Sequence, residues 1–459
     1  MKIANREQSA VELVREALAK AHEYQDEYHV FNWINDDAIR KAEEIDQKIA
    51  QGEAVGKLAG VPYALKDNFL SPEGESTASA LILEGFNSPV TATAVKKLEA
   101  EGAIMIGRTN LDAFAHGSST ENSYYGPTKN SKDTERVAGG SSGGSAVAVA
   151  LGIVPFALGT DTGGSIRQPA SFNGVYGLKP TYGAISRYGV VAMASSTDCI
   201  GFFTHEAEDL DLLMGVVAGQ DKNDQTTLPD FYRESTAKTV KKVGIIKDFD
   251  NEAVDSEIRE ALKRKTEALK AQGYEIVELE MPALKYALAA YYIIVPAEVS
   301  SNLSRHDGVR YGYRSADAGS LGELYENTRN EGFMPENKRR IMIGNFVLSS
   351  GFYDAYYLKA AKARTLIINE YAKAFEECDV ILTPVAPNPA FKLGEKVNDP
   401  VAMYLEDVMS VPLNLAGVPG LAVPAGKTKS GLDLGLQLVG PRRSDRTLIE
   451  FAQILEEVK

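Results

Sequence analysis

Short apolar runs alternate with amphipathic segments along most of this chain of 459 residues. The runs have the length and composition of buried strands, and they lie at 61–65, 103–110, 154–164, 242–248, 378–384, 420–426 and 435–440. Segments with helical periodicity lie between them, at 93–101, 145–151 and 206–218, and within 256–281, where a glycine separates a helix from a further strand. Alternation of this kind predicts one large α/β sheet layered by helices.

Two remaining parts of the chain have mainly helical patterns. Residues 9–52 show a 3.6-residue periodicity, and Ser9 is a candidate N-cap. Residues 286–374 predict a helical cap or an interaction surface. Because the last three strands must return to the same sheet, the sequence predicts one domain rather than two.

The charge of the chain argues against direct binding to nucleic acid. Lys and Arg number 49 against 63 Asp and Glu, which gives a formal net charge of −14 and no overall attraction to phosphate. The two cysteines, Cys199 and Cys378, provide neither a Cys-x-x-Cys pair nor a zinc site. There is no secretory signal and no run of about 18 apolar residues. The sequence therefore predicts a soluble, reduced, cytoplasmic protein that binds no metal.

The loop at 139–145, GGSSGGS, is the first candidate for function. A flexible linker should be flanked by polar, disordered sequence, but this loop runs directly into AVAVALG, which has the composition of a tightly packed helix. A phosphate cradle is a second interpretation, but the chain has neither nucleotide-binding glycine motif. These observations favour a loop that shapes the backbone for catalysis.

A second glycine cluster, DTGGSIRQPA, ends the strand at 154–164. The consecutive amides of Thr162, Gly163, Gly164 and Ser165 are predicted to converge on one oxyanion, because no Cβ intervenes at the glycines. Ser165 is then a candidate nucleophile on the same turn.

A serine nucleophile needs a base. Of the five histidines only His116 lies between the motifs, and no Ser-His-Asp order is apparent. Lys66 can serve if it is neutral, which from an ordinary pKa of about 10.4 costs roughly 4–5 kcal/mol at pH 7. Ser141 is a candidate relay between Lys66 and Ser165.

Three stretches closely resemble the amidase signature family: LAGVPYALKDN, GGSSGGS and GTDTGGSIRQPASFNGVYGLKPTYG. The resemblance implies hydrolysis of an amide, with Ser165 as the nucleophile, Ser141 as the relay and Lys66 as the base. It also implies a cis peptide bond between Gly140 and Ser141.

The resemblance also implies an architecture. It covers nearly the whole chain and implies a single α/β/α domain over 1–459, in which helices cover both faces of a central mixed β-sheet. Its parts are N-terminal helices at 1–55, a catalytic core at 56–285, a mainly helical cap at 286–375 and strands completing the sheet at 376–459.

Other stretches resemble one branch of this family, the glutaminase subunits of tRNA-dependent amidotransferases; they include GRTNLDAFAHGSSTENSYYGPTKN, RRIMIGNFVLSSGFYDAYY and MYLEDVMSVPLNLAGVPG. The resemblance implies that this chain frees ammonia from glutamine and that two partners, the B and C subunits, assemble with it. The B subunit uses the ammonia to amidate glutamyl- or aspartyl-tRNA, so ATP, Mg²⁺ and the tRNA belong to that partner. The C subunit is a small strap around this chain, and no cofactor is implied for the chain itself.

Glutamine carries an α-carboxylate and an α-ammonium, so its pocket needs a cation and an acid. The resemblance implies Arg340 for the carboxylate, Asp407 for the ammonium and Tyr291 as a lining residue. The alternative for Arg340 is a position on a solvated helix face. The alternative for Asp407 is a helix-capping or surface acid, and that for Tyr291 is packing in the core. Asp161 and Arg167 flank the nucleophile and are interpreted as an ion pair that braces its loop.

Three positions depart from the family pattern: Ala113, His116 and Phe202 stand where an acid, a methionine and a proline are usual. His116 is expected to lie beside the glutamine pocket. Two other functions stay open. One is a free-standing amidase that acts on another small amide without partners, and the other is a non-catalytic tRNA-binding protein, against which the net charge counts.

Overall fold

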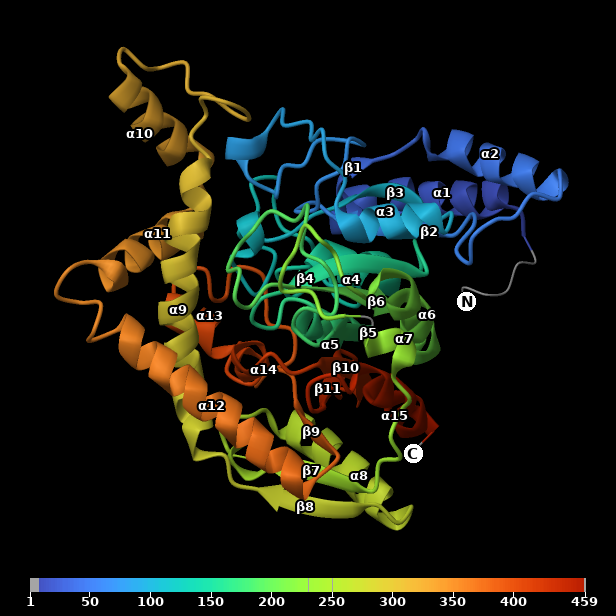
Figure 1. Ribbon diagram of the computed structural model, residues 1–459, viewed down its shortest axis with the longest axis vertical. Coiled ribbons are helices and arrows are strands. Elements are labelled where there is room, and N and C mark those ends of the chain that lie inside the picture. The colour runs from blue at the N-terminus through green and yellow to red at the C-terminus, as the bar shows by residue number, and fades with distance from the viewer. Residues whose placement is uncertain (1–7, 230, 250, 458–459) are drawn as a thin grey trace.

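The computed structural model describes residues 8–229, 231–249 and 251–457 (Figure 1). Within these ranges, strands β1 to β11 form one sheet in the order β1-β3-β2-β4-β6-β5-β10-β11-β9-β7-β8. Their bounds are Phe31–Ile34, Pro62–Lys66, Ile104–Thr109, Phe156–Asp161, Tyr176–Lys179, Cys199–Thr204, Lys242–Ile246, Glu275–Leu279, Val380–Pro384, Gly420–Lys427 and Asp433–Val439. Strand β2 is parallel to β3 and β4, and β7 is parallel to β8 and β9, while the other pairs are antiparallel. The predicted mixed sheet is confirmed, and the late strands do return to it.

Helices surround this sheet. Helices α1 to α8 are Ala10–Tyr28, Ala38–Ala50, Thr93–Ala100, Gly143–Ala150, Arg167–Asn173, Ala207–Val217, Phe231–Glu234 and Ser256–Ala271. Helices α9 to α15 are Ala287–Asn302, Leu321–Gly332, Pro335–Leu348, Tyr357–Glu377, Pro400–Leu405, Val411–Ala416 and Asp445–Glu457. Among the described residues, no helix is both long and apolar enough to cross a bilayer.

The two faces of the sheet belong to two separate hydrophobic cores. In β2, Tyr63 and Leu65 belong to one core, whereas Ala64 between them belongs to the other. The first core includes residues of α3 and α6, and the second includes residues of α1 and α4. Because successive side chains of a strand point to opposite faces, the sheet is covered on both sides, as predicted.

The interpretation of residues 9–52 as entirely helical is wrong at one point. Helix α1 begins at its predicted N-cap, where Ser9 and Glu12 form a capping box. Between α1 and α2, however, residues Phe31–Ile34 form β1, which pairs antiparallel with β3 at the edge of the sheet. Only Phe31 of its four residues is buried, so the strand is too short and too exposed to give an alternating pattern.

The predicted helical region consists of α9 to α12, which run along one side of the molecule (yellow to orange in Figure 1). Helices α9 and α11 pack backbone to backbone: a Cβ on Gly344 of α11 would lie 1.9 Å from the carbonyl oxygen of Pro296 in α9. Only glycine fits at this crossing. Tyr291 of α9 packs against Gly163, which follows β4, and Asn337 of α11 donates to the carbonyl oxygen of Ala113, which follows β3. Both helices contribute side chains to the site described below.

Candidate active site

Lys66 is the last residue of β2, at the carboxyl ends of the parallel strands β2, β3 and β4, where α/β sheets usually carry their functional groups. Its side chain is fully buried. The Nζ atom lies 2.8 Å from the hydroxyl oxygens of Ser141 and Ser142 and 2.9 Å from Thr160 Oγ1. Asn68 also donates to Thr160 Oγ1, at 3.0 Å. The amine therefore lies among neutral hydroxyl groups.

Burial lowers the pKa of the Lys66 amine to about 7, because it disfavours the charged form. The carboxylates of Asp112, Asp161 and Asp198 act in the opposite direction. At neutral pH a substantial fraction of the amine is therefore uncharged, which is the form that can accept a proton.

Ser141 and Ser165 come from two loops that are joined beside Lys66. Ser141 follows a cis peptide bond after Gly140, as the resemblance implied, and is fully buried. The amide of Ser142 donates to the carbonyl oxygen of Ser165 at 3.2 Å. Ser165 is 8% exposed, and within the described ranges its hydroxyl makes no hydrogen bond. Lys66 and Ser141 are in direct contact, whereas Ser165 is tied to them through the backbone.

The turn at 162–165 offers one amide fewer than predicted for an oxyanion hole. The Gly164 amide donates to Asp161 Oδ1 at 2.9 Å and is therefore occupied. The amides of Thr162, Gly163 and Ser165 have no partner in the part of the chain that the structure describes. A Cβ on Gly163 would lie 2.5 Å from the Tyr291 hydroxyl, so Tyr291 packs directly against this turn.

Asp161 and Arg167 form the predicted ion pair, and both are fully buried. Arg167 Nη2 lies 3.0 Å from Asp161 Oδ1, and Nε lies 3.1 Å from Oδ2. Arg167 also donates to Asn414, Gln437 and the carbonyl of Ser410. Burial by itself raises the pKa of the Asp161 carboxyl, but the guanidinium outweighs it and the pKa falls to about 2. The nucleophile turn is thus fixed to the C-terminal part of the sheet.

Replacing Asp161 with asparagine is expected to destabilise the protein by about 3–5 kcal/mol, because it leaves the buried Arg167 guanidinium without a counter-charge. Urea unfolding at pH 7 measures this as a lower transition midpoint. Glu44→Gln, which breaks the exposed pair with Arg40, is the control and should cost less than about 1 kcal/mol. Equal midpoints for the two variants would contradict a bracing role.

A cavity of about 220 Å³ lies beside the segment that follows β3, and its wall includes Arg340, Glu336, Tyr404, His116 and Ser118 but not Lys66, Ser141 or Ser165. Arg340 Nε donates to Glu336 Oε1 at 2.8 Å, and the guanidinium lies 5.7 Å from the ring centre of Tyr404. Its two Nη atoms have no partner among the described residues. Arg340 is 3% exposed, so it does not lie on a solvated helix face.

Asp407 lies behind the same cavity wall. Its Oδ1 accepts a hydrogen bond from Ser118 at 2.7 Å, and its Oδ2 accepts one from Tyr292 at 2.7 Å. Burial raises the pKa of the Asp407 carboxyl to about 6. Tyr292, which sequence reasoning missed, also lies under Arg340, whose guanidinium is 5.1 Å from its ring centre. Tyr292 therefore links the two residues predicted to bind glutamine.

Of the three departures from the family pattern, His116 lies at this cavity. It is fully buried, and its Nδ1 lies 3.3 Å from the carbonyl oxygen of Ala113. Burial lowers the pKa of His116 to about 3, so the imidazole is neutral at physiological pH. Phe202 is a core residue of β6, away from the site.

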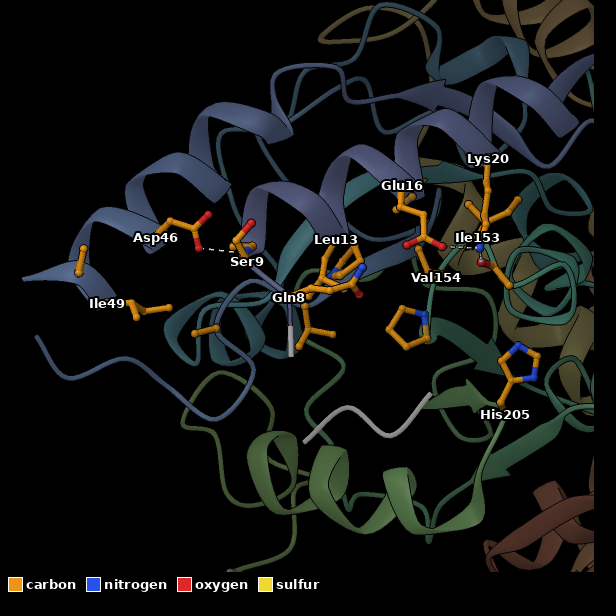
Figure 2. Close-up of a pocket in the computed structure, with 18 residues that line it drawn as sticks. Gln8, Ser9, Leu13, Glu16, Lys20, Asp46, Ile49, Ile153, Val154 and His205 are labelled. Atoms are coloured by element: carbon orange, nitrogen blue, oxygen red, sulfur yellow. Dashed lines mark hydrogen bonds and ion pairs between the residues drawn. The ribbon is translucent and has the colours of Figure 1, made fainter. Parts of the chain in front are cut away.

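A second cavity lies apart from the predicted site residues. A larger cavity of about 710 Å³ lies between α1, α2 and the turn at 152–155 (Figure 2). Leu13, Ile49 and Val154 line it, and none of the predicted site residues does. Within the described ranges, no three His, Cys, Asp or Glu side chains are arranged to hold a metal ion.

Residues 12–449 match the sequence profile of the amidase family. The chain therefore belongs to the amidase family, which fits a buried lysine and serine at the carboxyl edge of this sheet.

Several relatives share one name. The A subunit of glutamyl-tRNA(Gln) amidotransferase from Persephonella marina is 50% identical over 433 residues, which cover 93% of this chain and 89% of that protein. The protein of that name from Cyanothece sp. is 48% identical over 461 residues, covering 99% and 96%. The crystal structure of the protein of that name from Thermotoga maritima matches with a TM-score of 0.81 at 36% identity, covering 100% of this chain and 94% of that one. The predicted family and fold are confirmed.

Proposed function

We propose that this chain is the glutaminase subunit of a tRNA-dependent amidotransferase. The observation that carries the proposal is the buried Lys66 amine within hydrogen-bond distance of Ser141, in a chain that belongs to the amidase family. Similarity along nearly the whole chain to proteins named as the A subunit of glutamyl-tRNA(Gln) amidotransferase supports glutamine as the substrate.

Lys66 acts as the base through Ser141. A neutral amine has two N–H donors and one lone pair. The Ser142 hydroxyl donates to the carbonyl oxygen of Thr160 at 3.1 Å, so it can only accept from Lys66. Thr160 Oγ1 receives the second donor. The lone pair then remains for the hydroxyl of Ser141, which in turn takes the proton of Ser165.

The reaction proceeds through an ester. Ser165 Oγ attacks the side-chain amide carbon of glutamine while its proton passes through Ser141 to Lys66. The free amides of the turn, those of Thr162, Gly163 and Ser165, stabilise the oxyanion, and one such donor is typically worth about 2.7–4 kcal/mol in the transition state. The proton returns to the leaving nitrogen, and ammonia departs. Water then hydrolyses the glutamyl ester by the same relay in reverse.

Glutamine is held by its α-carbon substituents. The free Nη atoms of Arg340 present a planar pair of donors to the carboxylate, while Glu336 fixes the other edge of the guanidinium. Asp407 accepts from the ammonium, and Ser118 and Tyr292 orient its carboxylate. Tyr291 lines the site above the nucleophile turn.

Asp407→Asn is expected to raise KM for glutamine by about ten- to a hundredfold with a smaller change in kcat, because a charge-assisted hydrogen bond worth about 1.5–3 kcal/mol is lost. Steady-state kinetics measure both constants. Glutaramate, which is glutamine without the α-amino group, is the control substrate, and its KM should hardly change in the variant. A parallel loss for both substrates would contradict ammonium binding by Asp407.

The partners complete the reaction. In this proposal, the B and C subunits form a heterotrimer with this chain in the cytoplasm, and the B subunit binds the tRNA and supplies ATP and Mg²⁺. The test is a glutaminase assay of the chain alone and with both partners, ATP and charged tRNA. Stimulated release of glutamate supports the proposal. Hydrolysis of a different amide by a chain that purifies without partners would support a free-standing amidase instead.

A further inference from the structure

Asp112 lies between segment 117–122 and the loop that carries Ser141. It follows β3, is fully buried, and also contributes to the wall of the 220 Å³ cavity. Its Oδ2 accepts the amide of Thr120 at 2.8 Å, and its Oδ1 accepts the amide of Asn122 at 3.0 Å. Both amides belong to segment 117–122, which forms one wall of that cavity. The carboxylate therefore fixes a wall of the substrate pocket.

The same residue holds the relay loop. The amide of Asp112 donates to the carbonyl oxygen of Ser141 at 3.2 Å. A Cβ on Gly140 would lie 2.1 Å from Asp112 Oδ2, so the carboxylate packs directly against the backbone that precedes Ser141. Thr120 strengthens this connection, because its hydroxyl donates to the carbonyl oxygen of Gly139 at 2.7 Å. One side chain thus links the pocket wall to the loop that carries the proton relay.

We propose that Asp112 is a positioning residue of this active site, which keeps segment 117–122 and the Ser141 loop in a single arrangement around Lys66. The inference rests on the proposed roles of Lys66, Ser141 and Ser165. Asp112 does not contact Ser165 or take part in proton transfer. It sets where Ser141 and the pocket wall lie relative to the amine.

The charge of Asp112 allows a second measurement, because loss of a residue with a purely structural role would leave the pKa of Lys66 unchanged. Three buried carboxylates act on the Lys66 amine: Asp112, Asp161 and Asp198. Asp161 has Arg167 as its ion-pair partner, whereas burial raises the pKa of the Asp112 carboxyl to about 7, against the amides of Thr120 and Asn122 and the charge of Lys66. Asp112 and Lys66 therefore titrate over the same pH range, and the carboxyl is charged in the upper part of it. Removing the Asp112 charge is therefore expected to lower the pKa of Lys66.

The test compares Asp112→Asn and Asp112→Glu in the complete complex. Asparagine keeps one acceptor but turns an N–H toward a backbone amide, so kcat/KM for glutamine should fall about ten- to a hundredfold. The acid limb of the pH–rate profile should move to lower pH by about 0.5–1 unit. Glutamate keeps the charge but displaces the carboxylate, so kcat/KM should fall while the acid limb stays in place. Wild-type kinetics and an unmoved acid limb in Asp112→Asn would overturn the proposal.

A control variant and a second readout separate this inference from the choice of substrate. Asp445→Asn removes another fully buried carboxylate, one that accepts the amide and hydroxyl of Thr181, and it should not move the acid limb. Phenylmethylsulfonyl fluoride reports on Ser165 without glutamine, since Oγ displaces fluoride and the labelled protein is counted by mass. A labelling profile that shifts in Asp112→Asn supports the positioning role even if glutamine is not hydrolysed, whereas equal labelling profiles in wild type and Asp112→Asn overturn it.

Discussion

Replacement of Ser165 by alanine is expected to abolish glutamine hydrolysis and to leave the fold intact. The change removes a single oxygen atom that makes no hydrogen bond within the described ranges, so no hydrogen bond of the fold is lost. Loss of the nucleophile of a serine hydrolase lowers kcat by about 10⁶-fold. Release of glutamate from glutamine, measured with saturating partner subunits, ATP and charged tRNA, should therefore fall to background.

Ser171→Ala is the matched control for this variant. Ser171 lies in α5, which follows the nucleophile turn, and is 7% exposed, close to the 8% of Ser165. Its replacement is expected to leave turnover within about twofold, because substitutions that break no hydrogen bond and open no large cavity have small effects. Wild-type turnover by Ser165→Ala would refute the assignment of the nucleophile.

Replacement of Lys66 by methionine is expected to lower kcat by about 10⁴–10⁶-fold, because the relay loses its proton acceptor while a side chain of similar length still fills the buried space. In the wild-type protein the acid limb should have its midpoint near pH 7, since the pKa of Lys66 is about 7 and only the neutral amine can accept a proton. One pH unit below the midpoint, only about a tenth of the amine is neutral. Activity therefore rises as pH rises through 7.

The measurement is kcat between pH 5.5 and 8.5, with Lys66→Arg as a second variant. Arginine stays charged over this range and is expected to be inactive at every pH. Lys179→Met is the control, because Lys179 is another fully buried lysine, but its amine donates to the Pro180 carbonyl instead. A flat wild-type profile, or a titrating profile in Lys66→Arg, would contradict Lys66 as the base.

The sheet and the central residues of the site could be predicted because local patterns specify them. Apolar runs of strand length indicated β2 to β4 and β7 to β11, and Lys66, Ser141 and Ser165 stand in glycine-rich or strand-end motifs that have few other uses. Strand β1 was missed because only one of its residues is buried. Strands β5 and β6 were also missed, although both lie inside the sheet and all of their residues are buried. The Gly164 amide was assigned to the oxyanion hole, but the Asp161 carboxylate occupies it, and a sequence does not show which acceptor an amide meets.

The lining of the pocket was the least predictable part. Ser118 and Asp407 form one hydrogen bond across 289 residues of sequence, and such pairs are brought together only by packing. Ser142, Thr160 and Asn68 each stand one or two residues from a residue that was identified, at a strand end or in a motif. Adjacency to a predicted catalytic residue was therefore the signal that could have found them.

The glycine crossing between α9 and α11 fixes one side of the cavity that Arg340 and Glu336 line. Gly344 of α11 lies directly against the carbonyl oxygen of Pro296 in α9. Helix α11, which carries Arg340, and helix α9, which carries Tyr291 and Tyr292, therefore cannot slide past one another. The short helix α13 contributes Met403 and Tyr404 to the same wall, and Tyr404 is tied to this pair of helices because it donates to Glu336 of α11 and stacks on Tyr292 of α9. Arg340, Glu336, Tyr292 and Tyr404, which come from three helices, are therefore held together as one unit on this side of the cavity.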